Sequence, residues 1–321
     1  MRLQTALVTL CVTLLVPLAP HAASPQQEEG SFMLSVLRRD GIVVPFAAFD
    51  GRRWSQRWPE RLPLERPISL DDIPDGWWGV KPPPRRMHRW NDGATAGEVT
   101  ITVPVVTALM CAPRLALRSD YRSTEPVPPG FVVPFPKDGL LIAGEAALSK
   151  IDTLDPAAAE SAGVLRLAIG EFDRAESAAA TRFSSWRHPV KPADRKRAPV
   201  TLEAIYRAPA DEAGWTAYFI EAVRQYPPDP GDADGCGLAT YVSGWVVLGP
   251  NGVTVRLGAS ITFCDRKGVG YMLPFGVVRA DEKNYWVFQY SGFEAESYEV
   301  IRPHRRGLDT PVVYSVGQCG D

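Results

Sequence analysis

The residues that could carry a binding function gather in one proline-rich stretch of the sequence. Trp77 and Trp78 are followed, after a run of prolines, by Arg85, Arg89 and Trp90. Indole rings can stack on a sugar ring or a cation, and guanidinium groups can hold an anion through paired hydrogen bonds. This mixture predicts a ligand-binding loop. The alternative is that the tryptophans anchor the loop to the core while the arginines face water, because large aromatic side chains serve packing first.

Catalytic and cofactor motifs are missing from the sequence. His88, His188 and His304 lie far apart in the sequence, without the short spacing that makes a pair of metal ligands easy to build. We expect each of them to have a structural or surface role. The sequence contains no Gly-x-Ser-x-Gly, Ser-x-x-Lys or His-Glu-x-x-His signature and no phosphate-binding glycine loop. We therefore expect no metal, no cofactor and, on balance, no enzyme activity.

Two acidic loops could offer oxygen ligands to calcium. One runs from Asp229 to Gly235, and the other contains Asp71, Asp72 and Asp75. Neither has the alternate ligands and closing glutamate of an EF-hand loop. Both are therefore predicted to be solvated turns.

A carboxylate pair for glycoside hydrolysis could come from Asp265, Glu294 and Glu296. Such a pair needs a fixed separation across a cleft, and the sequence does not establish one. Glu294 and Glu296 are expected to face solvent on a strand.

The N-terminus has the layout of a secretory signal peptide over residues 1–23. Arg2 precedes an apolar run that ends at Leu18, and His21-Ala22-Ala23 resembles a cleavage site. The apolar run is too short to span a bilayer comfortably, and no second run of that kind follows. The mature chain is predicted to be exported to the periplasm or the extracellular space, without a transmembrane segment.

Four cysteines remain after the predicted cleavage, an even number that suits an oxidising compartment. They allow three pairings, and sequence alone cannot choose among them. We favour Cys236–Cys264 and Cys111–Cys319. A thiolate nucleophile and a metal site are weaker alternatives, because the sequence has no Cys-x-x-Cys motif.

The charge balance limits the partners. The formal net charge is −2, which gives no electrostatic reason to expect binding to nucleic acid. The expected partner is a glycan, a small ligand or another envelope protein.

The elements that must position these residues are mainly strands. From residue 253 to 263, apolar side chains alternate with polar ones, which predicts a half-buried strand, and Asn251-Gly252 before it supplies a hairpin turn. Similar short strands run on both sides of this segment. One helix is predicted over residues 164–183, packed across a sheet. Its predicted apolar face is formed by Leu165, Ile169, Phe172, Ala175, Ala179 and Phe183.

The fold is therefore predicted to be mainly β, with antiparallel sheets in a sandwich or a partly closed barrel, one amphipathic helix, and α+β character in the C-terminal half. Residues 24–31 are expected to form a mobile leader, residues 32–150 an N-terminal β-rich region with long proline-rich loops, and residues 151–321 a helix followed by an antiparallel sheet. The leading functional hypothesis is an exported, non-catalytic protein that binds a ligand, glycan or partner through its aromatic-rich loops. The alternatives are an exported, carboxylate-based glycoside hydrolase and a structural or accessory envelope protein.

Overall fold

The computed structural model describes residues 30–59, 69–81, 83–128, 134–227, 237–293 and 295–319. Strands account for 54% of the structure and helices for 12%, which confirms the mainly β prediction. Every strand pairing in the described residues is antiparallel. The predicted signal peptide and almost all of the predicted leader lie outside these ranges.

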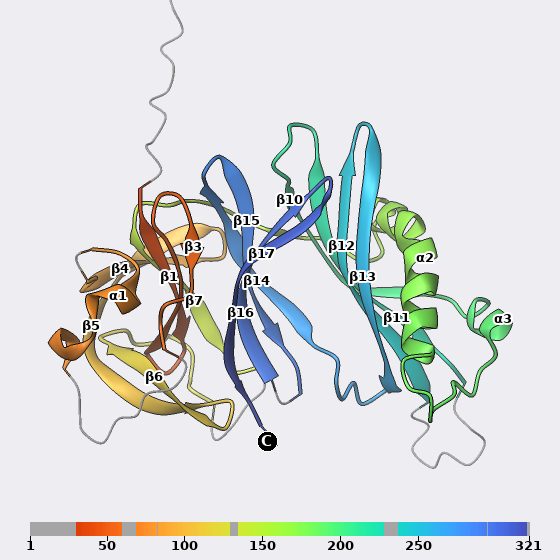
Figure 1. The fold of residues 1–321 in the computed structure, drawn as a ribbon, viewed down its shortest axis with the longest axis horizontal. Coiled ribbons are helices and arrows are strands. Elements are labelled where there is room, and N and C mark those ends of the chain that lie inside the picture. The colour runs from red at the N-terminus through yellow and green to blue at the C-terminus, as the bar shows by residue number, and fades with distance from the viewer. Residues whose placement is uncertain are drawn as a thin grey trace, which may run out of the picture.

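The N-terminal strands close into a six-stranded barrel in the order β1-β7-β4-β5-β6-β2, with β2 pairing back onto β1 (Figure 1). A short strand, β3 (Trp54–Ser55), pairs with the end of β2. The barrel strands are β1 (Phe32–Arg38), β2 (Ile42–Phe49), β4 (Arg86–Asn91), β5 (Ala94–Leu109), β6 (Ala112–Ser119) and β7 (Lys137–Gly144).

The first hairpin shows how local sequence starts the barrel. The side chain of Asp40 accepts a hydrogen bond from the Ile42 amide at 3.2 Å and pairs with Arg38 at 2.7 Å. Gly41 has a φ of +77°, a value that L-residues with a side chain rarely adopt. The Asp-Gly pair therefore turns β1 directly into β2.

Two five-stranded sheets follow, and we call them the middle sheet and the outer sheet. The middle sheet has the order β17-β16-β15-β14-β8, and the outer sheet has the order β13-β12-β11-β10-β9. The middle sheet contains β8 (Ala147–Ser149), β14 (Tyr271–Ala280), β15 (Lys283–Ser291), β16 (Ala295–His304) and β17 (Gly307–Gln318). The outer sheet contains β9 (Asp152–Thr153), β10 (Thr201–Pro209), β11 (Thr216–Gln225), β12 (Leu238–Gly249) and β13 (Gly252–Phe263).

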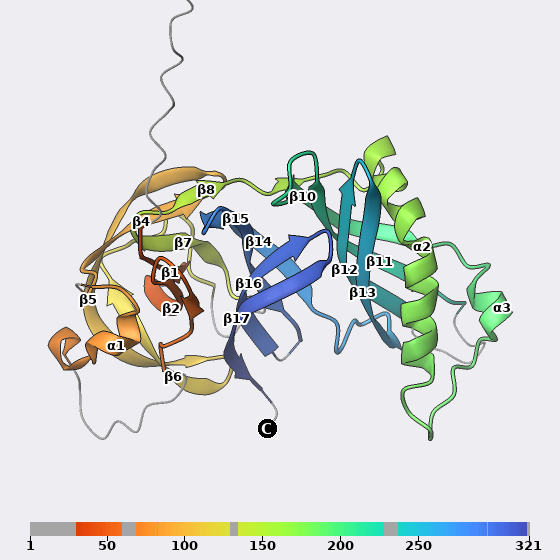
Figure 2. The ribbon, with the colours of Figure 1, turned by 45° about the horizontal axis from the view of Figure 1, so that its top comes forward.

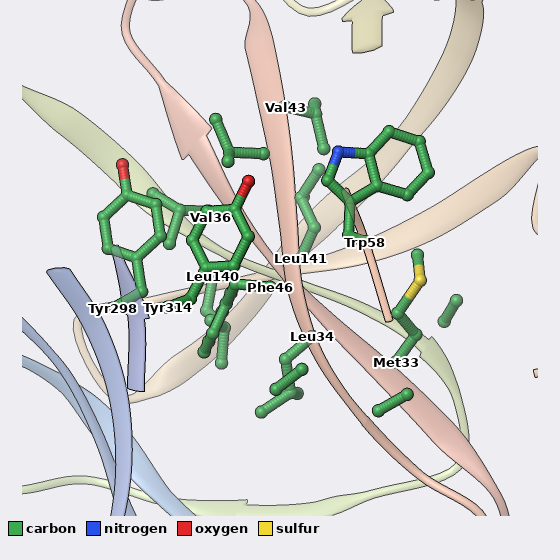
Figure 3. Packing of buried hydrophobic residues seen from close by; sticks show 14 of the residues in the cluster. Met33, Leu34, Val36, Val43, Phe46, Trp58, Leu140, Leu141, Tyr298 and Tyr314 are labelled. Atoms are coloured by element: carbon green, nitrogen blue, oxygen red, sulfur yellow. The ribbon is translucent and has the colours of Figure 1, made fainter. Parts of the chain in front are cut away.

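The middle sheet is covered on both faces, because side chains on a strand alternate between its two sides. On β15, Val287 joins the buried core of the barrel, whereas Trp286 and Phe288 join a second core shared with the outer sheet. Tyr298 and Tyr314 of the middle sheet lie against the barrel strands in Figure 3. The layers therefore run from the barrel through the middle sheet and the outer sheet to a helix (Figures 1 and 2).

That helix, α2 (Ala159–Ala180), covers the far face of the outer sheet, as the predicted helix does. Its buried stripe is Val164, Ala168 and Phe172, continued by Glu176 and Ala180. Most residues of the predicted apolar face lie one position away from this stripe, whereas Phe172 lies on it as predicted. Ile169 is 39% exposed because it lies outside the buried stripe, and Phe183 is 61% exposed beyond the end of the helix. The stripe is hard to recognise in the sequence because it contains a carboxylate, Glu176.

Three shorter helical segments lie in connections: the 3₁₀ helix η1 (Leu70–Asp72), α1 (Asp75–Trp78) and α3 (Pro192–Arg195). None of the helices in the described part of the chain has the length and apolar character that crossing a membrane requires.

A disulfide bond joins the barrel to the end of the chain. Cys111 and Cys319 are bonded, with their Cα atoms 5.2 Å apart, as the favoured pairing predicts. Cys264 is disulfide-bonded too, and its predicted partner Cys236 lies outside the described residues. The division of the chain at residue 150 stays a prediction, and the barrel core continues into strands β14–β17.

Candidate functional site

The tryptophans of the predicted binding loop lie in different surroundings. Trp78 is 1% exposed at the end of α1, with its ring centroid 5.2 Å from that of Trp58. Trp77 is half-buried against the barrel core. Gly79 ends α1 with a φ of +72°, and a Cβ there would lie 2.3 Å from the Cβ of Ala48. This part of the loop is packed onto the barrel, as in the alternative in which the tryptophans anchor the loop to the core.

The two arginines of the loop make contacts within the protein. Arg85 pairs with Asp71 at 2.5 Å on the surface. Arg89 donates hydrogen bonds to the Tyr121 hydroxyl at 3.1 Å and to the Asp138 carbonyl at 3.2 Å, and its guanidinium lies 5.2 Å from the Tyr121 ring centroid. Arg89 therefore braces neighbouring strands of the barrel.

Trp90 differs from these residues, because it lines a cavity, the first of two candidate sites. It is half-buried near the end of β4, and its indole Nε1 donates a hydrogen bond to the Phe275 carbonyl at 3.1 Å. A cavity of about 520 Å³ opens beside it. We call this the junction cavity, because its walls come from the barrel, the middle sheet and the outer sheet. They are Trp90, Asn91, Asp92, Gly93, Gly139, residues 150–154, Arg207, Pro274 and Phe275.

Backbone conformations that favour glycine shape this cavity. The β4–β5 hairpin turns at Asp92 and Gly93, with φ values of +49° and +83°. Gly139 has a φ of +130°, and a Cβ there would lie 2.4 Å from the Trp90 carbonyl oxygen. A Cβ on Gly276 would lie 2.9 Å from the Trp90 indole nitrogen. The close approach of the hairpin to β7 and β14 therefore requires both glycines.

The charges on the wall of the junction cavity are balanced. Lys150 pairs with Asp92 at 2.8 Å, and its hydrogen bond and positive charge lower the pKa of Asp92. Arg207 pairs with Asp152 at 2.8 Å and reaches Glu160 outside the cavity at 3.1 Å. Two cations and two carboxylates therefore surround the aromatic surface, which favours a polar ligand without a large net charge.

A second site lies between the outer and middle sheets, around Glu221 of β11. Its side chain is buried, and its Oε1 accepts a hydrogen bond from the Met272 amide of β14 at 2.7 Å. Burial raises the pKa of Glu221 to about 7. Glu221, Ser243 and Gly258 share one register row across β11, β12 and β13. Because Gly258 has no side chain, this row leaves space above the sheet.

Two adjoining cavities occupy that space, and we call them together the Glu221 cleft. Their volumes are about 210 and 410 Å³, and both are lined by Ser243, Gly258 and Tyr290. The smaller contains Glu221, and the larger contains Glu299. Burial raises the pKa of Glu299, and it also raises the pKa of Tyr290, with smaller contributions from the charges of Glu221 and Glu299.

Arg266 closes the wall of the smaller cavity. Its guanidinium lies 4.7 Å from the Tyr241 ring centroid and 4.3 Å from that of Tyr271. It also pairs with Glu203 at 2.9 Å. The cleft thus combines carboxyl groups, phenol rings and a cation, which are groups suited to binding and to proton transfer.

The other carboxylates singled out in the sequence line neither site where the structure describes them. Asp71 pairs with Arg85, and Asp72 accepts hydrogen bonds from the backbone and hydroxyl of Ser69. Glu296 is 4% exposed, so the expectation that it faces solvent was wrong. Its side chain points toward the barrel, where Lys137 pairs with it at 3.0 Å.

Two of the acidic candidates fall outside the described residues: Glu294 and the loop over residues 229–235. Within the part of the chain that the structure describes, no group of three His, Cys, Asp or Glu side chains could hold a metal ion.

Sequence reasoning missed the Glu221 cleft, although one signal for Glu221 was present. It is the only charged residue in the eight-residue run from Thr216 to Val223, which forms most of a buried strand. Burying a carboxyl group is costly, so a lone one in such a run marks a position with a special environment. Glu299 gives no comparable signal, since its strand alternates between polar and apolar residues.

Searches of protein-family models, curated proteins and solved structures give no match to this chain. A functional proposal therefore rests on the geometry of these two sites.

Proposed function

We propose that this is an exported binding protein that takes a glycan-class ligand in the junction cavity beside Trp90. The observation that carries the proposal is the meeting of a half-buried indole with two oppositely charged side-chain pairs at a cavity of about 520 Å³. A sugar ring has apolar C–H faces and a rim of hydroxyl groups. The indole suits the faces, and the carboxylate and cationic groups suit the hydroxyls.

The position of the cavity supports binding by a preformed site. Its walls are held by the Trp90–Phe275 hydrogen bond and by close contacts at Gly139 and Gly276, so little order has to be gained when a ligand enters. The lowered pKa of Asp92 also favours binding over acid catalysis, because this carboxyl gives up its proton far below neutral pH.

Export is supported by the N-terminal signal layout and by the Cys111–Cys319 bond, which suits an oxidising compartment. N-terminal sequencing of the protein purified from culture supernatant or periplasm would test it. Export predicts a chain that begins near residue 24.

The ligand proposal can be tested by titrating a panel of defined oligosaccharides into the mature protein in a calorimeter. We expect at least one to bind, and Trp90→Ala to weaken that binding by about tenfold or more, a loss typical of a central aromatic contact. Trp77→Ala is the matched control, because Trp77 is also half-buried and does not line the cavity. Equal losses in both variants, or no binding by the wild type, would contradict the proposal.

A second candidate function, hydrolysis of a glycosidic bond, is favoured by the Glu221 cleft. A carboxyl group with a pKa near 7 can donate a proton at neutral pH, and Glu299 in the adjoining cavity could serve as the second carboxylate. Release of reducing sugar from polysaccharides would test it. Glu221→Gln should abolish activity, whereas Glu145→Gln, an exposed control, should leave it unchanged.

A further inference from the structure

A lysine, a glutamine and a glutamate meet in the core between the barrel and the middle sheet. Lys137 comes from β7 of the barrel, Gln289 from β15 and Glu296 from β16. The side chains of Lys137 and Glu296 are 5% and 3% exposed, and Gln289 is 1% exposed. Three polar side chains from both bodies are thus enclosed together.

The carboxyl group of Glu296 bridges the other two. The Lys137 Nζ lies 3.0 Å from Oε1 and 3.1 Å from Oε2, and the Gln289 Nε2 lies 2.7 Å from the same Oε2. The Tyr298 hydroxyl donates to Oε1 at 2.9 Å and fixes the orientation of the carboxyl group. The amine and the amide therefore both contact one carboxylate oxygen, Oε2, and share Glu296 as a proton carrier.

Aromatic rings and a few polar groups complete the surroundings. The Lys137 Nζ lies 5.7 Å from the ring centroid of Phe135 and 5.9 Å from that of Tyr298, and it also donates to the Phe135 carbonyl at 2.6 Å. The Arg38 guanidinium lies over the Phe135 ring, 3.9 Å from its centroid, and pairs with Asp40. The enclosure keeps bulk water from competing with the groups inside it.

We infer that Lys137 and Gln289 become joined by an intramolecular isopeptide bond, with Glu296 as the proton carrier. First, the Lys137 ammonium gives a proton to the Glu296 carboxylate, which leaves a neutral amine beside a carboxylic acid. The Nζ lone pair then attacks Cδ of Gln289, and the Nζ–Cδ bond forms. Glu296 takes the second proton from Nζ and gives a proton to Nε2, so the Cδ–Nε2 bond breaks and ammonia leaves.

The reaction is balanced without an oxidant or another co-reactant, since an amine and a primary amide yield a secondary amide and ammonia. Burial favours the neutral amine, because desolvation lowers the pKa of Lys137 even though Glu296 opposes that shift. A desolvated, neutral lysine is the form that acts as a nucleophile. The released ammonia can carry the remaining proton away and restore the carboxylate.

The bond would tie the barrel to the middle sheet at a second place. The Cys111–Cys319 disulfide already joins β6–β5 of the barrel to the end of β17. An isopeptide between β7 and β15 would hold the same two bodies together under reducing conditions, which a disulfide cannot do.

Mass spectrometry of the intact mature chain, denatured and reduced, tests the inference without any ligand. The expected mass is lower than the sequence mass by one ammonia, and a protease digest should contain a branched peptide that joins the Lys137 and Gln289 segments. An unmodified wild-type mass with separate, unmodified peptides would overturn the inference. Because this mass is measured on the wild-type chain, the test does not depend on whether variants fold.

Variants separate this bond from other losses of ammonia. Lys137→Arg and Glu296→Gln should each have the full sequence mass, whereas Lys267→Arg, which changes an exposed lysine outside both candidate sites, should keep the deficit. A deficit that persists in Lys137→Arg would show that ammonia is lost elsewhere, for instance by cyclisation of an N-terminal glutamine, and would also overturn the inference.

Discussion

Trp78 and Trp90 come from the same proline-rich stretch, yet one packs and the other lines a cavity. Trp78 is buried against Trp58, and its indole nitrogen has no hydrogen-bond partner among the described residues. Trp90 is half-buried, and its indole N–H donates a hydrogen bond to the Phe275 carbonyl of a distant strand. The comparison teaches that what surrounds an aromatic residue, more than its presence in a loop, decides whether it can meet a ligand.

Two buried glutamates repeat this contrast. Glu176 of α2 is 1% exposed and accepts hydrogen bonds from Arg195 at 3.3 Å, Arg224 at 2.9 Å and the Tyr226 hydroxyl. Glu221 is 5% exposed and has one backbone donor, Met272, with a cavity beside it. A buried carboxylate with several hydrogen-bond donors stabilises the fold. One with few donors and a cavity beside it can bind a ligand or transfer a proton.

The largest change in stability should come from breaking the hydrogen-bond network around Glu176. Glu176→Gln removes the charge that compensates two buried arginines, and loss of one partner of a buried pair costs about 3–5 kcal/mol. Unfolding by urea should show this loss in the free energy of unfolding. A loss below about 1 kcal/mol would mean that the network has no structural role.

Replacement of the packed tryptophan should cost nearly as much. Trp78→Ala leaves a cavity in the barrel core, and such truncations cost about 3–5 kcal/mol. The same urea experiment on Trp90→Ala should give a smaller loss, since Trp90 is only half-buried. If the two losses were equal, the contrast between packed and cavity-lining tryptophan would not hold.

Replacement of Glu221 should raise the free energy of unfolding, whereas the two replacements above lower it, and the size of the gain should depend on pH. Its pKa is about 7 in the folded protein and about 4.5 in the unfolded chain, so the folded state binds the proton more tightly. The stability contributed by this group is complete below pH 4.5 and is lost as the pH rises to about 7. The uncharged Glu221→Gln variant should therefore be more stable than the wild type by up to about 3 kcal/mol near pH 8 and not near pH 4.

Denaturation curves at the two pH values would measure the difference. Glu176→Gln serves as the contrasting variant, because it should destabilise the protein at both values. A Glu221→Gln variant that destabilises equally at both would show that this carboxyl group is held like Glu176.

Much of the fold follows from local sequence. The alternation over residues 253–263 and the Asn-Gly turn before it become β13 and its hairpin with β12, and the Asp40-Gly41 turn becomes the β1–β2 hairpin. The Cys111–Cys319 pairing was correctly favoured as well. These features depend on neighbouring residues or on a small set of choices.

The sites could not be predicted in the same way, because they join distant segments. Trp90 meets Phe275, which lies 185 residues further along the chain, and Glu221 meets the backbone of β14. Which strand of one sheet faces which strand of another is set by packing of the whole molecule. Side-chain pattern on a single strand therefore indicates a buried or exposed position and says nothing of its partners.

A crystal structure of the mature protein with the tightest-binding oligosaccharide would show whether the junction cavity binds a glycan. We expect a sugar ring stacked on Trp90, with hydroxyl groups near the Asp92–Lys150 and Asp152–Arg207 pairs. A ligand seated in the Glu221 cleft, or on a surface away from both cavities, would contradict it.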